Sequence, residues 1–274
     1  MIEIPESHTL AHQLSKTVIG KTVAQTIASQ SPHGFAWYYG DPADYDARLR
    51  GRTIDSAVAH AGYVEMQAGD HTILISEGAN LRYLEPGKSP PKKHQLYIRF
   101  SDDSALVCTT SMYGLYYVYP AGAHDNIYYQ AALSTPAPLT DAFTTGHFAS
   151  LLTDESRKLS AKAFLATEQR IPGLGNGCLQ DILFFADVHP RRKMHTLSDT
   201  DFGKLYHTVR DKLAEMTLLG GRDTEKDLFG NVGGYHAILS KNTVGHACPL
   251  CGNTIQRQAF LGGNIYFCPG CQPL

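Results

Sequence analysis

The segment ACPLCGNTIQRQAFLGGNIYFCPGCQ (residues 247–272) carries four cysteines in the pattern C-x2-C-x16-C-x2-C. Each Cys-x-x-Cys unit places two sulfurs on one tight turn, and four thiolates give Zn²⁺ the closed tetrahedral shell of a structural site. We therefore predict one structural Zn²⁺ ion with these ligands: Cys248, Cys251, Cys268 and Cys271. The intervening residues predict a β-hairpin with Gly262 and Gly263 at its turn. The alternatives are four buried cysteines or two redox pairs; His246 is a substitute ligand that four cysteines make unnecessary.

The composition around this module is that of a globular protein. The chain has 274 residues, of which 43% are hydrophobic and 18% charged, and a length of this order fits about two domains. A net charge of -2 argues against a protein that coats phosphates over its whole surface, although local basic patches remain compatible with nucleic acid. The chain has no run of about 18 apolar residues and no signal-peptide pattern, so we expect no membrane segment and a cytosolic location. In that reducing compartment, paired cysteines favour a metal over disulfides.

The N-terminal half is predicted to be a helix followed by strands. Within residues 1–20, Leu10, Leu14 and Val18 recur every four residues, as on one face of a helix. Alternating apolar runs then predict strands of a β-sandwich or barrel at residues 71–76, 94–100, 104–110 and 114–119.

Helical periodicity takes over from about residue 150. The Pro- and Thr-rich stretch 134–146 precedes it and is typical of an interdomain linker. Apolar residues then follow one face of two helices, at 179–186 and 202–216. Ser198, with Asp201 three residues later, predicts a capping box for the second helix.

The segment IPGLGNG (171–177) joins two helical patterns. Gly173 and Gly175 permit a tight turn with positive φ, and Asn176 is the predicted cap of the helix that follows. Free N–H groups at a helix N-terminus attract phosphate, and Lys162 on the preceding helix is expected to reach the same phosphate. The alternative is an ordinary helix hairpin with a glycine turn.

Four segments together resemble one family, the formamidopyrimidine-DNA glycosylase / endonuclease VIII family of base-excision enzymes. MIEIPE (1–6) is similar to that family's opening MPELPE. ATEQRIPGLGNGCLQDILFFADVHPRRK (166–193) resembles its helix–two-turn–helix signature, and residues 247–272 resemble its zinc finger. APLTDAF (137–143) stands at the interdomain position, so the resemblance covers essentially the whole chain.

The resemblance implies an α+β multidomain fold with DNA in the cleft between domains. We expect an N-terminal helix plus two-layer antiparallel β-sandwich at 1–133 and a linker at 134–149. A helix–two-turn–helix domain at 150–240 and a four-cysteine zinc-finger hairpin at 241–274 follow. The implied partner is double-stranded DNA with damaged bases or abasic sites, bound by a monomer in the bacterial cytosol or nucleoid. Such enzymes flip the damaged nucleotide out of the stack, because its glycosidic carbon is unreachable inside a duplex.

The expected catalytic residues lie at the N-terminus. The family's nucleophile is the amine of an N-terminal proline, but Ile2 stands there, and a bulky second residue normally leaves Met1 in place. Glu3 and Glu6 match the family's two glutamates, of which the first acts in proton transfer at the sugar. These four residues are our catalytic candidates, with the Met1 amine as the substitute nucleophile. Glu3 could instead be an acid that complements a helix dipole.

The resemblance also implies DNA contacts. Asn176 and Lys162 are carried over as phosphate ligands, with Gly175 beside them in the GxGN motif. Tyr113, in TTSMYG (109–114), keeps an aromatic ring where the family has a wedge residue. The alternative for Tyr113 is a strand residue among neighbouring tyrosines.

Several family residues are missing. The stretch 59–66 has no lysine where the family carries one, and SEGANLRY (76–83) lacks the wedge histidine and methionine. Ser111 replaces an arginine, and Gly263 and Asn264 stand where a finger arginine is expected. The nearby residues that could compensate are Gln256, Arg257 and Gln258.

Three hypotheses follow from this pattern. The first is a divergent DNA glycosylase, without efficient strand cleavage, that uses Glu3 to assist water or the Met1 amine as nucleophile. The second is a catalytically inactive module that binds damaged DNA. The third is an unrelated zinc-ribbon protein that binds protein partners. Retention of both glutamates favours the first hypothesis, and loss of the proline and of basic contacts favours the second.

Overall fold

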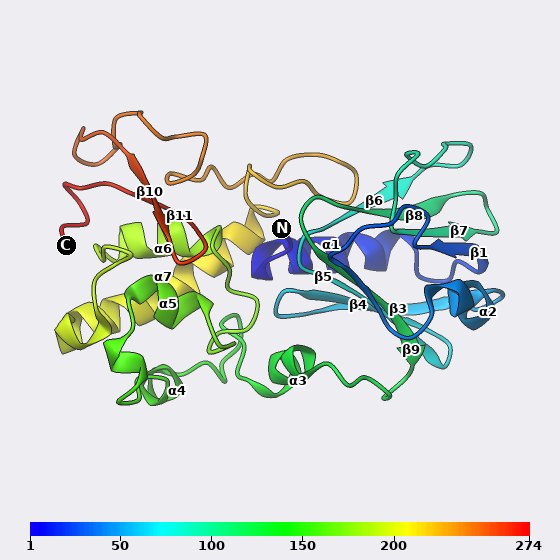
Figure 1. Cartoon of the computed structure of the whole chain (residues 1–274), viewed down its shortest axis with the longest axis horizontal. Coiled ribbons are helices and arrows are strands. Elements are labelled where there is room, and N and C mark those ends of the chain that lie inside the picture. The colour runs from blue at the N-terminus through cyan, green and yellow to red at the C-terminus, as the bar shows by residue number, and fades with distance from the viewer.

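Helix α1 (Ile4–Thr17) lies between two lobes in the computed structural model, which describes all 274 residues (Figure 1). Leu10 and Leu14 are buried on the face that packs into the sheet lobe. Ile4, at the start of the same helix, belongs instead to the core of the helical lobe. The predicted N-terminal helix is therefore confirmed, and it joins the two cores.

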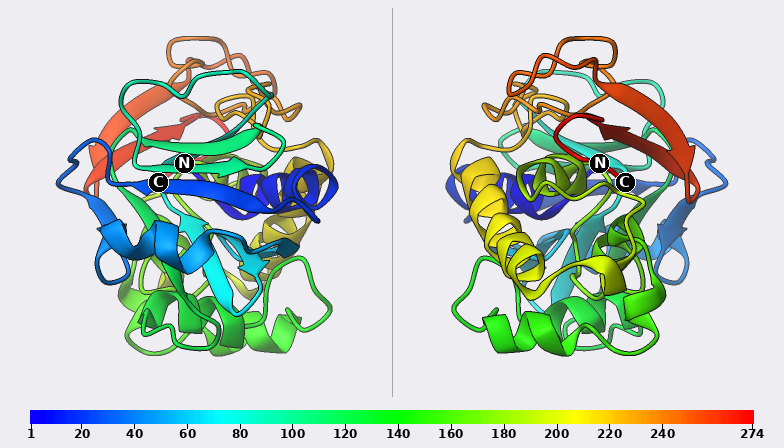
Figure 2. Two further views of the ribbon diagram at one scale, coloured as in Figure 1. Left: turned by 90° about the vertical axis from the view of Figure 1, so that its right-hand side faces the viewer. Right: turned by 90° about the vertical axis from the view of Figure 1, so that its left-hand side faces the viewer.

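Two sheets form the N-terminal lobe, and the end-on view shows them as separate layers (Figure 2). The strands are β1 (Val23–Ala28), β2 (Ala36–Tyr38), β3 (Ile54–His60), β4 (Tyr63–Ala68), β5 (His71–Ser76), β6 (Ala79–Leu84), β7 (Leu96–Phe100), β8 (Ala105–Thr110) and β9 (Gly114–Pro120). One sheet has the order β2-β9-β5-β4-β3 and the other β1-β7-β8-β6. Every pairing is antiparallel except β2 with β9, which is parallel. The predicted two-layer sandwich is confirmed, with one parallel edge strand added.

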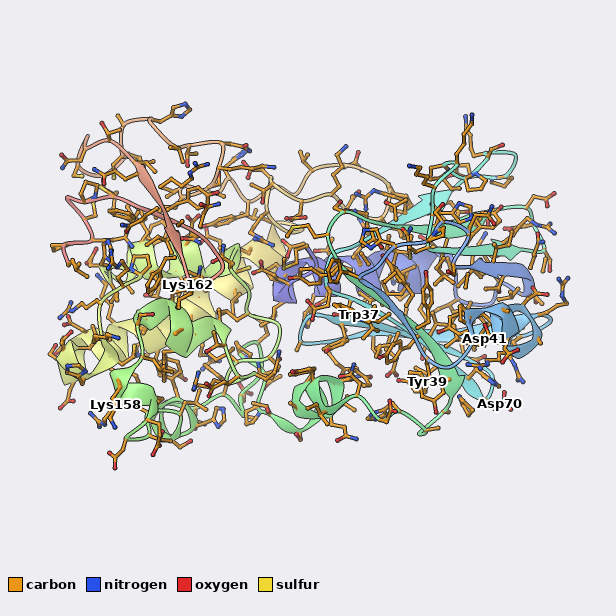
Figure 3. The ribbon with its side chains drawn as sticks, in the orientation of Figure 1. Trp37, Tyr39, Asp41, Asp70, Lys158 and Lys162 are labelled. Atoms are coloured by element: carbon orange, nitrogen blue, oxygen red, sulfur yellow. The ribbon has the colours of Figure 1, made fainter.

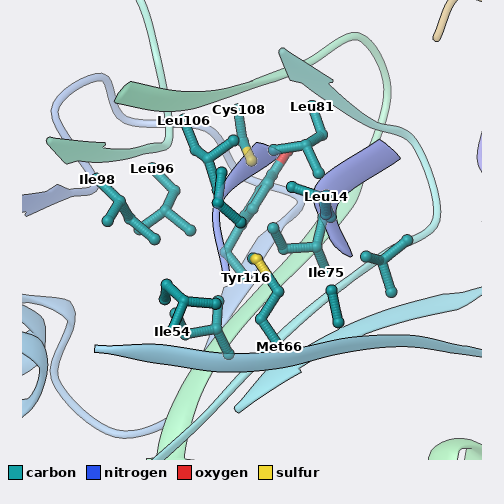
Figure 4. Packing of buried hydrophobic residues seen from close by; sticks show 14 of the residues in the cluster. Leu14, Ile54, Met66, Ile75, Leu81, Leu96, Ile98, Leu106, Cys108 and Tyr116 are labelled. Atoms are coloured by element: carbon teal, nitrogen blue, oxygen red, sulfur yellow. The ribbon is translucent and has the colours of Figure 1, made fainter. Parts of the chain in front are cut away.

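The core of this lobe lies between the two sheets and α1. Leu14 of α1, Ile75 of β5 and Leu81 of β6 are fully buried there and come together in Figure 4. The short helix α2 (Tyr45–Leu49) closes one end through Tyr45, whose hydroxyl donates to the Tyr116 carbonyl at 2.8 Å. Alternate residues of each strand supply this core, as the period-2 patterns predict.

The second lobe is helical. The helix α3 (Ile127–Ser134) leads into it from the sheet lobe. The helices of this lobe are α4 (Thr145–Ser150), α5 (Ala161–Ala166), α6 (Cys178–Phe185) and α7 (Asp199–Leu218). The capping box of α7 is present, because Ser198 and Asp201 each accept the other's backbone N–H. Phe143 and Phe148 are fully buried in this core, so part of the expected linker packs with the helices. No helix of the structure has the length and apolar character needed to cross a membrane.

The C-terminal hairpin consists of β10 (Gln256–Phe260) and β11 (Gly263–Phe267) and packs against α6. Its two turn residues are Leu261 and Gly262, with φ of 50° and 70°. The expectation of Gly263 in the turn is wrong by one position, because Gly263 pairs with Phe260 as a strand residue. Two positive φ values are what a tight two-residue hairpin turn requires.

Candidate active site and nucleic-acid interface

A cavity of about 530 Å³ opens between the lobes, a size typical of ligand sites. Its walls come from the N-terminal residues, the ends of several strands, the turn before α6 and the tip of the β10–β11 hairpin. The lobes touch beside it, where a side chain on Gly173 would lie 2.2 Å from the Gly62 nitrogen. Only glycine fits at this contact, and Gly173 has the predicted positive φ, of 78°. The same expectation for Gly175 is wrong, because its φ is not positive.

Glu3 ties the N-terminus to the turn before α6. Its carboxylate accepts the backbone N–H groups of Gly175 at 3.1 Å, Gly177 at 2.8 Å and Cys178 at 2.9 Å. The guanidinium of Arg222 faces one of its oxygens at 3.3 Å. Three of the roughly four acceptor positions of this carboxylate are therefore filled by backbone N–H groups, and a cation faces it. Gly175 has no room for a side chain, because a Cβ there would lie 2.7 Å from this carboxyl.

The predicted cap of α6 by Asn176 is wrong. The cap residue is Gly177, and the free N–H groups of α6 are satisfied by Glu3, from the far end of the chain. Asn176 instead donates from Nδ2 to the Asn264 carbonyl of the hairpin at 3.1 Å. A carboxylate is the stronger partner for the positive end of a helix, which explains why it displaces the amide.

Arg222 is a buried cation that the sequence analysis missed. It is 3% exposed, and it bonds both oxygens of Glu6, from Nε at 3.0 Å and from Nη2 at 2.8 Å. Burial by itself raises the pKa of Glu6, but the charge and hydrogen bonds of Arg222 outweigh burial and leave that pKa below its usual value. Arg222 is therefore a cation beside Glu3 that comes from a segment other than 59–66. No spacing in the sequence links Arg222 to either glutamate.

Met1 lies at the junction of this cavity and a second one of about 230 Å³. Its α-amine forms an ion pair with Glu225, and its sulfur accepts the Tyr113 hydroxyl at 3.7 Å. Ile2 is buried, and its N–H donates to the Glu77 carbonyl at 2.8 Å. Of the two N-terminal residues, only Met1 therefore presents an amine to a cavity.

Lys162 and Asn176 both reach the hairpin next to Gly263, where a Cβ would lie 3.6 Å and 3.8 Å from their side-chain nitrogens. Their shared phosphate contact stays a prediction. Lys162 Nζ donates to the Phe260 carbonyl at 2.7 Å, and Figure 3 labels it on the helical lobe. Burial lowers the pKa of this ammonium. Each side chain gives one donor to the hairpin, which leaves further N–H donors on both.

Tyr113 stands at the edge of the cavity on the opposite lobe. Its ring centroid is 6.0 Å from that of Trp37, which is 44% exposed. Met112 is also exposed and lines the same cavity. This apolar edge offers ring faces on which an unpaired base can stack.

Arg257 and its neighbours form the exposed strand β10 of the hairpin. Arg257 pairs across the hairpin with Tyr266, and its side chain has no ion-pair partner. Arg191, which the sequence analysis did not single out, lies over the Phe260 ring at 5.5 Å and donates to Gln258 at 3.3 Å. The hairpin thus carries a small basic surface although Gly263 and Asn264 bring no charge.

The four cysteines of the hairpin module converge. The sulfurs of Cys248, Cys251, Cys268 and Cys271 all lie within 4.8 Å of one another, close enough to hold a metal ion. His246 is not part of this group. The donor set is four thiolates, which suits a closed tetrahedral site.

Known proteins share this architecture. The model of the formamidopyrimidine-DNA glycosylase N-terminal domain matches residues 1–112. A formamidopyrimidine-DNA glycosylase of Cytobacillus firmus is 27% identical, with 99% of this chain and 100% of that protein covered. One from Laribacter hongkongensis is 28% identical, with the same coverage.

Solved structures agree with the sequence comparisons. The crystal structure of the MutM (Fpg) protein from Thermus thermophilus has a TM-score of 0.81 at 25% identity, covering 98% of both chains. The Lactococcus lactis Fpg bound to abasic-site DNA has a TM-score of 0.84 at 21% identity, covering 99% and 100%, which establishes the fold. A helix-and-sandwich lobe joined to a helical lobe with a four-cysteine hairpin defines the glycosylase fold. Over its whole length the chain is similar to formamidopyrimidine-DNA glycosylases, and its first 112 residues match the model of their N-terminal domain.

Proposed function

We propose that this protein is a divergent DNA N-glycosylase of base-excision repair, which binds double-stranded DNA with damaged bases or abasic sites in the cleft between its lobes. One observation carries the proposal: the Met1 amine, Glu3, Lys162, Asn176 and Tyr113 all contribute to that cleft or its edge. The relatives support it, since solved structures of Lactococcus lactis Fpg hold DNA with an abasic site or a Fapy-dG.

In this proposal the phosphate backbone is held by Lys162 and Asn176. Tyr113 fills the space that a flipped nucleotide leaves in the stack. Arg257 adds a further phosphate contact from the hairpin. Because these contacts lie around the cavity, they would present the sugar of the flipped nucleotide to Met1 and Glu3.

The Met1 amine is the proposed nucleophile. It stands in the place of the family's proline amine, shifted by up to about 3.6 Å along the chain. An amine must lose a proton before it attacks C1′, and Glu225, which contacts it, is placed to accept that proton. If the amine does not attack, a water molecule can, and the negative charge of Glu3 stabilises the cationic sugar in either case.

We further propose that the four cysteines hold one structural Zn²⁺ ion, which would fix the hairpin against α6. The metal would take no part in the chemistry, because four thiolates leave no open coordination position. The protein is proposed to act as a monomer in the cytosol or nucleoid.

Borohydride trapping tests the enzyme. The protein is incubated with abasic and oxidised-base duplexes, with and without borohydride, and an N-terminally acetylated sample is the matched control. A trapped adduct that disappears on acetylation supports the Met1 amine as nucleophile. Base release without trapping, lost in Glu3→Gln, supports attack by water.

The competing function is a catalytically inactive module that recognises damaged DNA. Ile2 in the place of the family's N-terminal proline favours it, as does the absence of several of the family's basic DNA contacts. Lesion-selective binding with neither base release nor trapping, across a broad panel of lesions, would establish this alternative and exclude the glycosylase.

A further inference from the structure

Glu77 is a second acidic side chain in the cavity between the lobes, and it differs from Glu3 in having no partner. Its side chain is half-buried and lines the cavity with Met1 and Tyr63. Its carboxyl group makes no hydrogen bond or ion pair within the protein, whereas Glu3 accepts three backbone N–H groups. The Glu77 oxygens are not among the buried side-chain atoms that lack a partner, so this carboxyl group is open to the cavity. Acidic groups with perturbed surroundings in a cleft concentrate at functional sites.

The backbone holds Glu77 in an unusual conformation. The residue lies between β5 and β6, where the chain passes from one sheet to the other, and its φ is 66°. Its carbonyl accepts the Ile2 N–H at 2.8 Å. The next residue, Gly78, is pressed so closely on Tyr113 that a Cβ there would lie 2.2 Å from the Tyr113 carbonyl oxygen. Strained backbone that is fixed from both sides is typical of residues placed for a task.

The surroundings favour the protonated form of this carboxyl group. Burial, reinforced by the negative charge of Glu3, raises the pKa of Glu77 above its usual value. The other ionisable groups of the cavity are the Met1 amine, Tyr63, Tyr113 and Lys162. Both tyrosines have raised pKa values, mainly through burial, so they stay neutral near pH 7. Glu3 and Glu77, the two carboxyl groups of the cavity, therefore have different surroundings, and different surroundings suit two carboxyl groups to different roles.

We propose that Glu77 is the general acid of this site, the group that protonates the departing base. The proposal rests on the glycosylase function. Glu3 is less suited to the task, because three backbone N–H groups bond its carboxylate and the Arg222 cation faces it, and both favour the ionised form. A proton donor needs a carboxyl group without protein partners beside the space that receives the nucleotide, and Glu77 lines that space.

The proton balance is closed. The bond between C1′ and the base nitrogen breaks, and its electron pair stays on that nitrogen, which takes the proton of Glu77. The nucleophile, either water or the Met1 amine, forms the new bond to C1′ and releases a proton. That proton returns Glu77 to its acid form, directly or through solvent.

The test is single-turnover base release by Glu77→Gln over a range of pH, on a substrate that the wild-type protein processes. Glu85→Gln, at an exposed carboxyl outside the cavity, is the matched control. We expect a rate lower by about 10²- to 10⁴-fold in Glu77→Gln, with loss of the fall in rate at high pH that the wild type shows. Thermal unfolding and affinity for an abasic-analogue duplex should match the wild type. A substrate whose base leaves readily without a proton should recover most of the rate.

Different results separate the two claims. Base release by the wild type with an unchanged rate and pH profile in Glu77→Gln overturns the role of Glu77 alone. A slower rate that the readily leaving base does not recover also overturns it, because the defect is then not in protonation. A wild-type protein that releases no base from any lesion overturns the glycosylase function itself, and the general acid with it.

Discussion

Replacing Arg222 by methionine should cost the protein a large part of its stability. The guanidinium is 3% exposed and is the only cation that contacts the buried carboxylates of Glu3 and Glu6. Methionine fills similar space but leaves two buried negative charges without a cation, with backbone hydrogen bonds as their remaining partners. Removing one side of a buried ion pair costs about 3–5 kcal/mol. For a protein of this size, that loss lowers the Tm by roughly 10 °C.

Arg99→Met is the matched control for this change. Arg99 pairs with Asp103 at 2.9 Å on the surface, where the side chains are 35% and 70% exposed. Such exposed pairs contribute about 0–1 kcal/mol. A second variant, Glu6→Gln in the Arg222→Met background, should recover part of the loss, because it removes one of the unpaired charges.

The stability lost in Arg222→Met should also depend on pH, and the protonation of Glu6 decides whether the loss grows or shrinks in acid. Arg222 holds the pKa of Glu6 below the ordinary value of 4.5, so the pair stabilises the fold above that pH and loses this contribution as the pH falls through the lowered pKa. Arg222→Met removes the charge and side-chain hydrogen bonds of the guanidinium and keeps two backbone hydrogen bonds to Glu6. Burial, the largest influence on this group, then raises the pKa of Glu6 and lets it take up a proton. The wild-type advantage should therefore be largest near pH 7 and shrink in acid.

Thermal and chemical unfolding at several pH values measure this difference. A loss near pH 7 no larger than that of Arg99→Met would refute the reasoning. A large loss that stays constant into acid would refute the electrostatic cause and point to packing instead.

The other predictions concern the cleft and the hairpin. Lys162→Met should weaken DNA binding and reduce the slope of log affinity against log salt by about 0.9, as for one lost phosphate contact; an unchanged slope in binding titrations argues against the contact. Arg257→Ala should also reduce the slope of log affinity against log salt. A slope equal to that of the wild type would show that Arg257 makes no contact with a DNA phosphate. Gly177→Ala should destabilise the protein by at least about 3 kcal/mol, because a Cβ would lie 1.4 Å from the buried guanidinium of Arg222. Gly203→Ala is the control, since it has open space around it and should not destabilise the protein. Equal Tm values for the two variants would contradict this prediction. Cys268→Ser should abolish stoichiometric zinc measured by metal analysis, and full retention would exclude the four-thiolate site.

Local patterns in the sequence were enough for much of the fold. The periodicity of Leu205, Val209 and Leu213 predicts α7, and the spacing of Ser198 and Asp201 predicts its cap. Alternating runs predict β5 and β7 to β9, because a half-buried strand repeats every second residue. The three-residue strand β2 was missed, since so short a run shows no clear alternation and its partner β9 lies far away in the chain.

Some features of the site can likewise be read from the sequence, and others need the tertiary structure. The sequence by itself determined the four-cysteine group, since its ligands lie in two close pairs whose spacing is read directly. Only the tertiary structure decided that Glu3, rather than Asn176, caps α6. It also decided that Arg222 neutralises two glutamates more than 200 residues away, and that Glu77 stands without a partner in the cavity. Burial, charge pairing and the absence of a partner depend on contacts between distant segments, and no spacing along the chain encodes them.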